Sequence, residues 1–173
     1  GFFYAPLVIT GLHHMFLAVD FQLMGSSLKG TYLWPIVAIS NICQGSAAFG
    51  AWLIYKRRKM AKEEGLALTS GVSAFLGVTE PAMFGVNLPL KVPFFAAICT
   101  SGVLGAVIGA NRVLGNVGVG GVPAFISIQS KYWYIYILVI LLAMILPAVL
   151  TVIFSKFTKI KAKEMVENPN DIK

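Results

Sequence analysis

The run of apolar residues at 132–155, YWYIYILVILLAMILPAVLTVIFS, limits most strongly how this chain can fold. About 20 consecutive apolar residues are enough to cross a lipid bilayer as a helix. Comparable runs occupy residues 2–24, 31–55 and 92–111. We therefore predict an all-α integral membrane protein with several transmembrane helices.

Composition supports a membrane protein rather than a soluble one. Of the 173 residues, 57% are hydrophobic and 12% are charged, whereas roughly a quarter of the residues in a soluble domain are charged. The formal net charge of +7 is by itself also typical of proteins that bind nucleic acid. The placement of the basic residues argues against nucleic acid, because they follow two of the apolar runs. They are Lys56, Arg57, Arg58, Lys59 and Lys62, and then Lys156, Lys159, Lys161 and Lys163.

Basic clusters next to spans are typical of the cytoplasmic side of a membrane protein. We therefore expect the loop 56–64 and the polar tail 158–173 in the cytoplasm, with residues 1–157 as the membrane domain. Gly1 then lies inside and the turn at 25–30 outside. The sequence starts at Gly1 directly in an apolar run, so we expect a piece of a longer protein.

Residues 65–90 differ from the other apolar segments, because glycines and prolines interrupt them around Thr79-Glu80-Pro81. Non-helical backbone at membrane depth is tolerated only where protein or a water-filled cavity surrounds it. We predict a re-entrant hairpin or broken helix that carries the Thr-Glu-Pro motif at its break. The stretch GNVGVGGVP at 115–123 is expected to form a flexible loop.

Glu80 is the sharpest candidate for a functional residue. Ionisable side chains within membrane segments mark substrate or ion sites by default. At a helix break, a carboxylate and unpaired backbone groups together offer hydrogen bonds to a polar solute. Thr79 and Asn87 add neutral hydrogen-bonding groups nearby. The alternative is a carboxylate paired to a buried base for stability alone, although such pairs are rarely net stabilisers.

His13, His14 and Asp20 are the other candidates in the apolar sequence. Adjacent residues on a helix point about 100° apart, so one histidine is expected to face a cavity and the other to pack. Asp20 has a pairing role or a substrate role. Asn41 and Gln44 share one helix face, where they either line a polar pathway or bond between helices. No residue spacing indicates a metal site, a cofactor or an activated nucleophile, so chemistry would be completed by groups outside this chain.

Four stretches carry a resemblance to a known family: GLHHMFLAVDFQL at 11–23, AISNICQGSA at 38–47, GVTEPAMFGVNL at 77–88 and GVGGVPAFISIQSKYW at 118–133. They resemble the membrane (IIC) domain of the phosphoenolpyruvate-dependent sugar phosphotransferase system, in its glucose, sucrose and β-glucoside group. The resemblance covers residues 8–157. The last stretch is most similar to members that handle trehalose.

The resemblance implies a homodimeric permease of the bacterial cell membrane that phosphorylates its sugar during uptake. It implies a disaccharide substrate, trehalose ahead of sucrose or a β-glucoside, converted to trehalose 6-phosphate. A IIB domain phosphorylated on cysteine donates the phosphoryl group, and a IIA protein is a further partner. The implied sugar-binding residues are Glu80 and His13; relatives specific for β-glucosides have Gln in place of His14. The IIB cysteine motif is absent from this sequence, so the fragment alone is not expected to be active.

Two other classes of protein remain open from the residues themselves. One is a proton-coupled secondary sugar transporter, in which Glu80 and Asp20 carry the protons. The other is a purely structural membrane subunit. A sugar that enters the cell already phosphorylated would separate the permease from the secondary transporter.

Overall fold

The computed structural model describes residues 1–157, apart from residues 13, 26–29, 117 and 119, and its regular elements are helices. The α-helices are α1 (Tyr4–Ile9), α2 (His14–Met24), α3 (Leu33–Arg57), α4 (Ala61–Phe75), α5 (Glu80–Ala82), α6 (Leu88–Leu90), α7 (Val92–Ala110) and α8 (Trp133–Phe157). A π-helix, η1 (Met83–Asn87), connects α5 to α6. Two 3₁₀-helices, η2 (Val122–Ser127) and η3 (Ser130–Tyr132), precede α8.

Three helical stretches in the described part of the chain are long and apolar enough to cross a membrane. They are α3, α7 and Ser130–Lys156, which consists of η3 and nearly all of α8. They coincide with the predicted spans at 31–55, 92–111 and 132–155. The prediction of an all-helical membrane protein is therefore confirmed.

The segment 2–24 is not the single spanning helix that its length predicts. It forms α1, of six residues, and α2, of 11 residues. Between them Gly11 has a φ of +75°, a left-handed conformation that glycine adopts at little cost. An 11-residue helix is about 16 Å long, roughly half the thickness of the hydrocarbon core of a bilayer.

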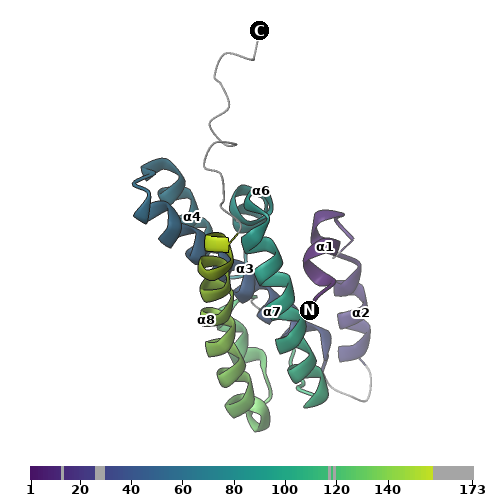
Figure 1. Cartoon of the computed structure of the whole chain (residues 1–173). Helices are drawn as coiled ribbons and strands as arrows, with labels where there is room; N and C mark the ends of the chain where they lie inside the picture. Colours follow the sequence, from purple (N-terminus) through teal and green to yellow (C-terminus); the bar gives the residue numbers. More distant parts are fainter. Residues whose placement is uncertain (13, 26–29, 117, 119, 158–173) are drawn as a thin grey trace.

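Helix α3 lies at the centre of the molecule, in contact with α4, α7 and α8 (Figure 1). All its residues from Val37 to Ala48 are buried. Small residues allow this close packing: a Cβ placed on Gly50 would lie 2.9 Å from the carbonyl oxygen of Ala148 in α8. On another side, Gly45 faces the ring of Phe75 in α4.

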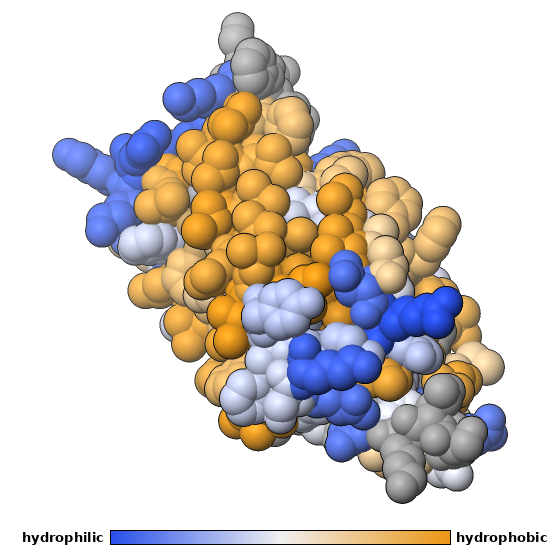
Figure 2. Space-filling view, turned by 90° about the horizontal axis from the view of Figure 1, so that it is seen from below, coloured by the Kyte–Doolittle hydropathy of each residue, from blue (hydrophilic) through white to orange (hydrophobic). Residues whose placement is uncertain are grey.

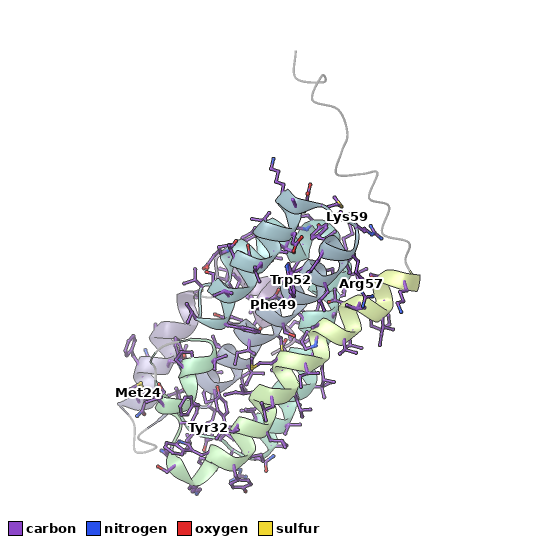
Figure 3. The ribbon with its side chains drawn as sticks, turned by 90° about the vertical axis from the view of Figure 1, so that its left-hand side faces the viewer. Met24, Tyr32, Phe49, Trp52, Arg57 and Lys59 are labelled. Atoms are coloured by element: carbon purple, nitrogen blue, oxygen red, sulfur yellow. The ribbon has the colours of Figure 1, made fainter. Side chains whose placement is uncertain are left out.

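Contacts along α3 give the direction of its neighbours. The hydroxyl of Tyr136 donates to the carbonyl oxygen of Pro35 over 3.2 Å, and Gly50 lies against Thr151, so α8 runs parallel to α3. Figure 3 shows Met24 and Tyr32 near one end of the molecule and Arg57 and Lys59 near the opposite end.

Pro147 lies inside α8 and removes a backbone donor from that helix. Ser46 of α3 compensates at the neighbouring turn. Its hydroxyl donates to the carbonyl oxygen of Met144 over 2.6 Å and accepts from the amide of Ala148 over 3.1 Å. The hydroxyl therefore stands between the two groups of one helical hydrogen bond, which is how a serine side chain makes proline tolerable in a membrane helix.

The outer surface is largely apolar. Figure 2 shows a broad hydrophobic area bordered by hydrophilic patches. On α8 the exposed apolar side chains include Leu138, Leu141, Ile145 and Val149, which recur at helical spacing. Such a stripe fits a helix face that meets lipid.

Candidate functional site

The chain breaks its helical path immediately before Glu80. Helix α4 ends at Phe75, and Gly77 has a φ of +107°. Ser73 closes the break, because its hydroxyl donates to the carbonyl oxygen of Val78 over 3.0 Å and its own carbonyl oxygen accepts from the amide of Val78 over 3.0 Å. Helix α5 then begins at Glu80 with a proline in its first turn, where the missing N–H is no loss.

The backbone after the break is also irregular. The π-helix Met83–Asn87 precedes Pro89. A proline ring excludes the α-helical bond to the residue four positions earlier, and a wider turn avoids that clash. Lys91, with a φ of +61°, ends the segment and turns the chain into α7. Residues 80–90 are thus a short, interrupted helical segment with a kink on either side.

Glu80 and Thr79 differ in exposure although they are neighbours. Thr79 is buried, and Glu80 is exposed on the surface of the described residues. Helix α1 covers the same region, because Tyr4 and Ala5 pack in one cluster with Met83. The phenol of Tyr4 lies within electrostatic range of the carboxylate of Glu80. Tyr4 is therefore a candidate that the sequence did not single out.

Asn87 is fully buried against α3. Its Nδ2 donates to the carbonyl oxygen of Gln44 over 2.9 Å and to Oε1 of Gln44 over 2.7 Å. Oδ1 of Asn87 and Nε2 of Gln44 are buried without a hydrogen-bond partner. The pair attaches the segment 80–90 to the centre of α3, so Gln44 bonds between helices, one of the two roles that its position allows.

Asp20 is buried in α2. Its Oδ1 accepts a hydrogen bond from the hydroxyl of Thr31, and the Thr31 hydroxyl oxygen accepts from the amide of Leu33 over 3.0 Å. Asp20 is thus paired with Thr31, at the turn that leads into α3. It also lies within electrostatic range of Tyr4.

The two histidines are placed only in part. His13 lies outside the described residues, and His14 begins α2, with a side chain whose surroundings are not described. The structure therefore brings Thr79, Glu80 and Tyr4 into one region and anchors that region through Asn87.

The glycine-rich stretch 115–123, expected to be a flexible loop, meets the helix break through its described residues. Gly115 pairs with Thr31 through two backbone hydrogen bonds of 2.8 and 3.1 Å. A Cβ placed on Gly77 would lie 2.9 Å from Cα of Gly120, and one placed on Gly121 would lie 2.8 Å from the backbone nitrogen of Gly77. Backbone therefore packs on backbone at the break. Composition alone did not reveal this contact.

The arrangement suits the binding of a polar, uncharged solute. It offers a carboxylate beside irregular backbone at a helix break, as the discontinuous helices of transporters do. Among the described residues, no group of three His, Cys, Asp or Glu side chains is placed to hold a metal ion.

Comparison with known proteins finds a family model and several relatives that match most of this chain. The family model described as phosphotransferase system, EIIC, matches residues 1–102. The chain is 51% identical over 158 residues to the trehalose-specific EIIBC component of the phosphotransferase system of Bacillus subtilis, a match that covers 91% of this chain and 33% of that protein. It is 47% identical over 152 residues to the trehalose-specific EIIBC component of Escherichia coli, covering 87% and 31% of the two chains.

A sucrose-specific EIIBC component from Staphylococcus xylosus is 49% identical over 141 residues, which cover 79% of this chain and 29% of that protein. The chain thus spans about a third of the length of the relatives that it matches. No solved structure matches it.

Proposed function

The chain belongs to the phosphotransferase system EIIC family, and we propose that it supplies part of a membrane domain that takes up a disaccharide and presents it for phosphorylation. The observation that carries this proposal is the family match over residues 1–102, which include the break at Glu80. The sugar is trehalose, converted to trehalose 6-phosphate. Similarity to two trehalose-specific relatives supports trehalose, and similarity to a sucrose-specific one leaves sucrose as the competitor to test.

The proposed partners follow from the chemistry of the system. A IIB domain carries a phosphocysteine that receives its phosphoryl group from a IIA protein, and the permease is a homodimer in the bacterial cell membrane. A sugar hydroxyl oxygen attacks the phosphorus, the S–P bond breaks, and the cysteine leaves as a thiolate. The hydroxyl proton passes to Glu80 or His13 as general base. Positioning of the attacking oxygen in line with the leaving sulfur supplies most of the rate.

The proposed orientation places residues 56–64 and the tail from 158 onward in the cytoplasm. The segment 61–90 enters the membrane from that side and returns to it. Two observations support this path. Phe75, at the end of α4, lies against Gly45 in the middle of α3, and α6 lies at the same end of the molecule as the start of α4 (Figure 1). The Thr-Glu-Pro motif then sits at the tip of a re-entrant hairpin, half-way across the bundle.

At that tip Glu80 binds the sugar. Each carboxylate oxygen accepts a hydrogen bond from a hydroxyl, and charge-assisted bonds are the stronger kind. Thr79, His13 and His14 add hydrogen bonds, and Asp20 shapes the outer end of the site through Thr31. Asn87 offers only Oδ1, since its Nδ2 is bonded to Gln44, so its part is chiefly to hold the segment 80–90.

The decisive experiment is equilibrium binding of labelled trehalose to the purified intact permease. Glu80→Gln keeps the shape of the side chain and removes its charge. A charge-assisted hydrogen bond is worth about 1.5–3 kcal/mol, so affinity should fall by roughly ten- to over a hundredfold. Lys91→Ala, at the exposed turn before α7, is the control and should bind like the wild type.

Wild-type affinity in Glu80→Gln would show that the carboxylate does not hold sugar. A second measurement tests the class of transporter. Labelled trehalose taken up by cells should appear inside as a phosphate ester, and its appearance as free sugar would identify a secondary transporter instead.

A further inference from the structure

A small cavity lies between the ends of α3 and α8. Its volume is about 160 Å³. Each helix contributes three lining residues at the same spacing: Ile54, Arg57 and Arg58 from α3, and Val152, Ser155 and Lys156 from α8. Residues three and four apart share one helix face, so two matching helix faces line the space, which is open to the surface.

Positive charge dominates this cavity. Arg57, Arg58 and Lys156 are exposed at its rim, and none of the described lining residues is acidic. Basic residues in a last turn also complement a helix dipole, which is the simpler explanation of their presence. However, the C-terminus of each helix carries about half a negative charge, so the two ends together offset only about one of the two positive charges of Arg57 and Lys156. The net charge at the cavity stays positive.

The cavity lies where the spanning helices reach the membrane surface. The spanning stretches of α3 and α8 end at Arg57 and Lys156. Figure 3 shows Arg57 near the end of α8. Ile54 and Val152, the two apolar residues that line the cavity, lie three or four positions before its basic residues and therefore on the side of the spanning stretches. An occupant therefore meets cations at its head and apolar side chains below.

We propose that this cavity binds the phosphate of an anionic phospholipid, with its acyl chains against the apolar surface below. Guanidinium groups hold phosphate oxygens in pairs, and basic pockets between membrane helices are suited to lipid headgroups. The basic loop has other cations that are placed differently: Lys56 lies over the ring of Trp52 at 4.9 Å, and Lys59 and Lys62 do not line the cavity. The loop as a whole would attract anionic lipid diffusely, whereas the cavity would hold one molecule.

The test is saturable binding of phosphatidylglycerol to the purified intact permease in mixed micelles, followed by native mass spectrometry. Each basic residue near a membrane surface contributes a free energy that corresponds to about a fivefold change in affinity. Arg57→Gln combined with Lys156→Gln should therefore weaken binding by about 30-fold. Lys59→Gln combined with Lys62→Gln removes the same charge outside the cavity and should leave the bound lipid in place.

Several outcomes would overturn the proposal. If both Gln double variants lose the same affinity for phosphatidylglycerol, the basic residues attract the lipid only diffusely. Equal retention of phosphatidylcholine, or displacement of the lipid by inorganic phosphate at similar concentration, would mean that the site does not select an anionic lipid. Unchanged lipid binding with lost phosphoryl transfer in Arg57→Gln/Lys156→Gln would assign the cavity to the phosphorylated protein donor.

Two further variants keep the test independent of folding. Arg57→Lys combined with Lys156→Arg preserves both charges and should retain affinity within a few-fold. Ser155→Leu fills the cavity without any change of charge and should abolish the saturable component. Full lipid binding in a monodisperse Ser155→Leu protein would contradict the proposed position of the headgroup.

Discussion

Helices α3 and α8 are both 25 residues long and both span the molecule. However, the more polar of the two helices, α3, is the more deeply buried one. In α3, the less apolar of the two, 78% of the most apolar stretch is buried, against 28% in the more apolar α8. A soluble protein would show the reverse relation. The difference shows that α3 is the interior of this molecule and that α8 faces its apolar solvent.

The physical reason lies in the lipid. Apolar side chains gain little by moving from lipid into protein, so close packing and hydrogen bonds hold membrane helices together. Helix α3 carries both, through Gly45 and Gly50 and through Gln44 and Ser46. Four sets of substitutions test this comparison between α3 and α8.

The largest effect is expected where a glycine of α3 packs against α8. Gly50→Leu places a side chain where a Cβ alone would lie 2.7 Å from Cβ of Thr151. Overpacking of this kind costs about 3 kcal/mol, and the free energy of unfolding of the intact protein in mixed micelles should fall by that amount. Gly109→Leu on α7 is the control, since nothing lies within 4 Å of its Cβ position. Equal stability of the two variants would mean that α3 and α8 do not touch.

The next effect concerns the amide pair that joins the centre of α3 to η1. Asn87→Leu leaves Oε1 of Gln44 buried without a donor, which costs about 2 kcal/mol. Replacement of both partners removes the polar groups together, so Gln44→Leu/Asn87→Leu should be less destabilising than the two single changes added. Chemical denaturation of the four proteins gives the double-mutant cycle, and strict additivity would rule out the bond.

A smaller effect is expected at Ser46 of α3, whose hydroxyl bonds to backbone groups of α8 near Pro147. Ser46→Ala removes the hydroxyl between Met144 and Ala148 and should cost about 1 kcal/mol. Pro147→Ala lets α8 close that hydrogen bond by itself, so the cost of Ser46→Ala should shrink in the Pro147→Ala background. Thermal unfolding of the single and double variants measures this. The same cost in both backgrounds would show that Ser46 acts independently of the proline.

The smallest effect is expected on the outer face of α8. Leu141 is 53% exposed, and Leu141→Ala exchanges one lipid contact for another. Its unfolding free energy should change by less than about 0.5 kcal/mol. Ile140→Ala, one position away on the buried face, should cost about 2 kcal/mol, the low end for such a truncation because the side chain gains little by leaving lipid. If both variants lose the same stability, α8 is enclosed by protein on all sides.

The spans were predictable because length and hydropathy suffice for them. The expected 31–55 corresponds to α3 at Leu33–Arg57, and 92–111 corresponds to α7 at Val92–Ala110. The same criteria failed for 2–24, because a single glycine at positive φ divides it, and φ at Gly11 depends on its surroundings. A helix break at Thr79-Glu80-Pro81 was also foreseeable, since proline and glycine act locally.

The site was less predictable because its contacts join distant segments. Nothing near Gln44 in the sequence indicates Asn87, 43 residues later, as its partner. Tyr4 carries no local signal at all, and it is a candidate only because α1 packs against Met83. Asp20 could be recognised as unusual, but its hydrogen bond with Thr31, 11 residues later, depends on how the chain turns between them.

The contact between Gly77 and the turn at Gly121 affects how a mutational scan of this protein should be interpreted. Both residues have positive φ. A side chain at Gly77 would collide with the backbone of Gly120, and a side chain at Gly121 would collide with the backbone of Phe75 and Gly77. Nearly every substitution at these two codons should therefore abolish uptake as thoroughly as loss of Glu80. Such a scan would score them as substrate residues, although neither glycine has a side chain with which to hold a sugar. Purified variants that lose fold and binding together would separate these shape-determining positions from Glu80, where the proposed role predicts that binding alone is lost.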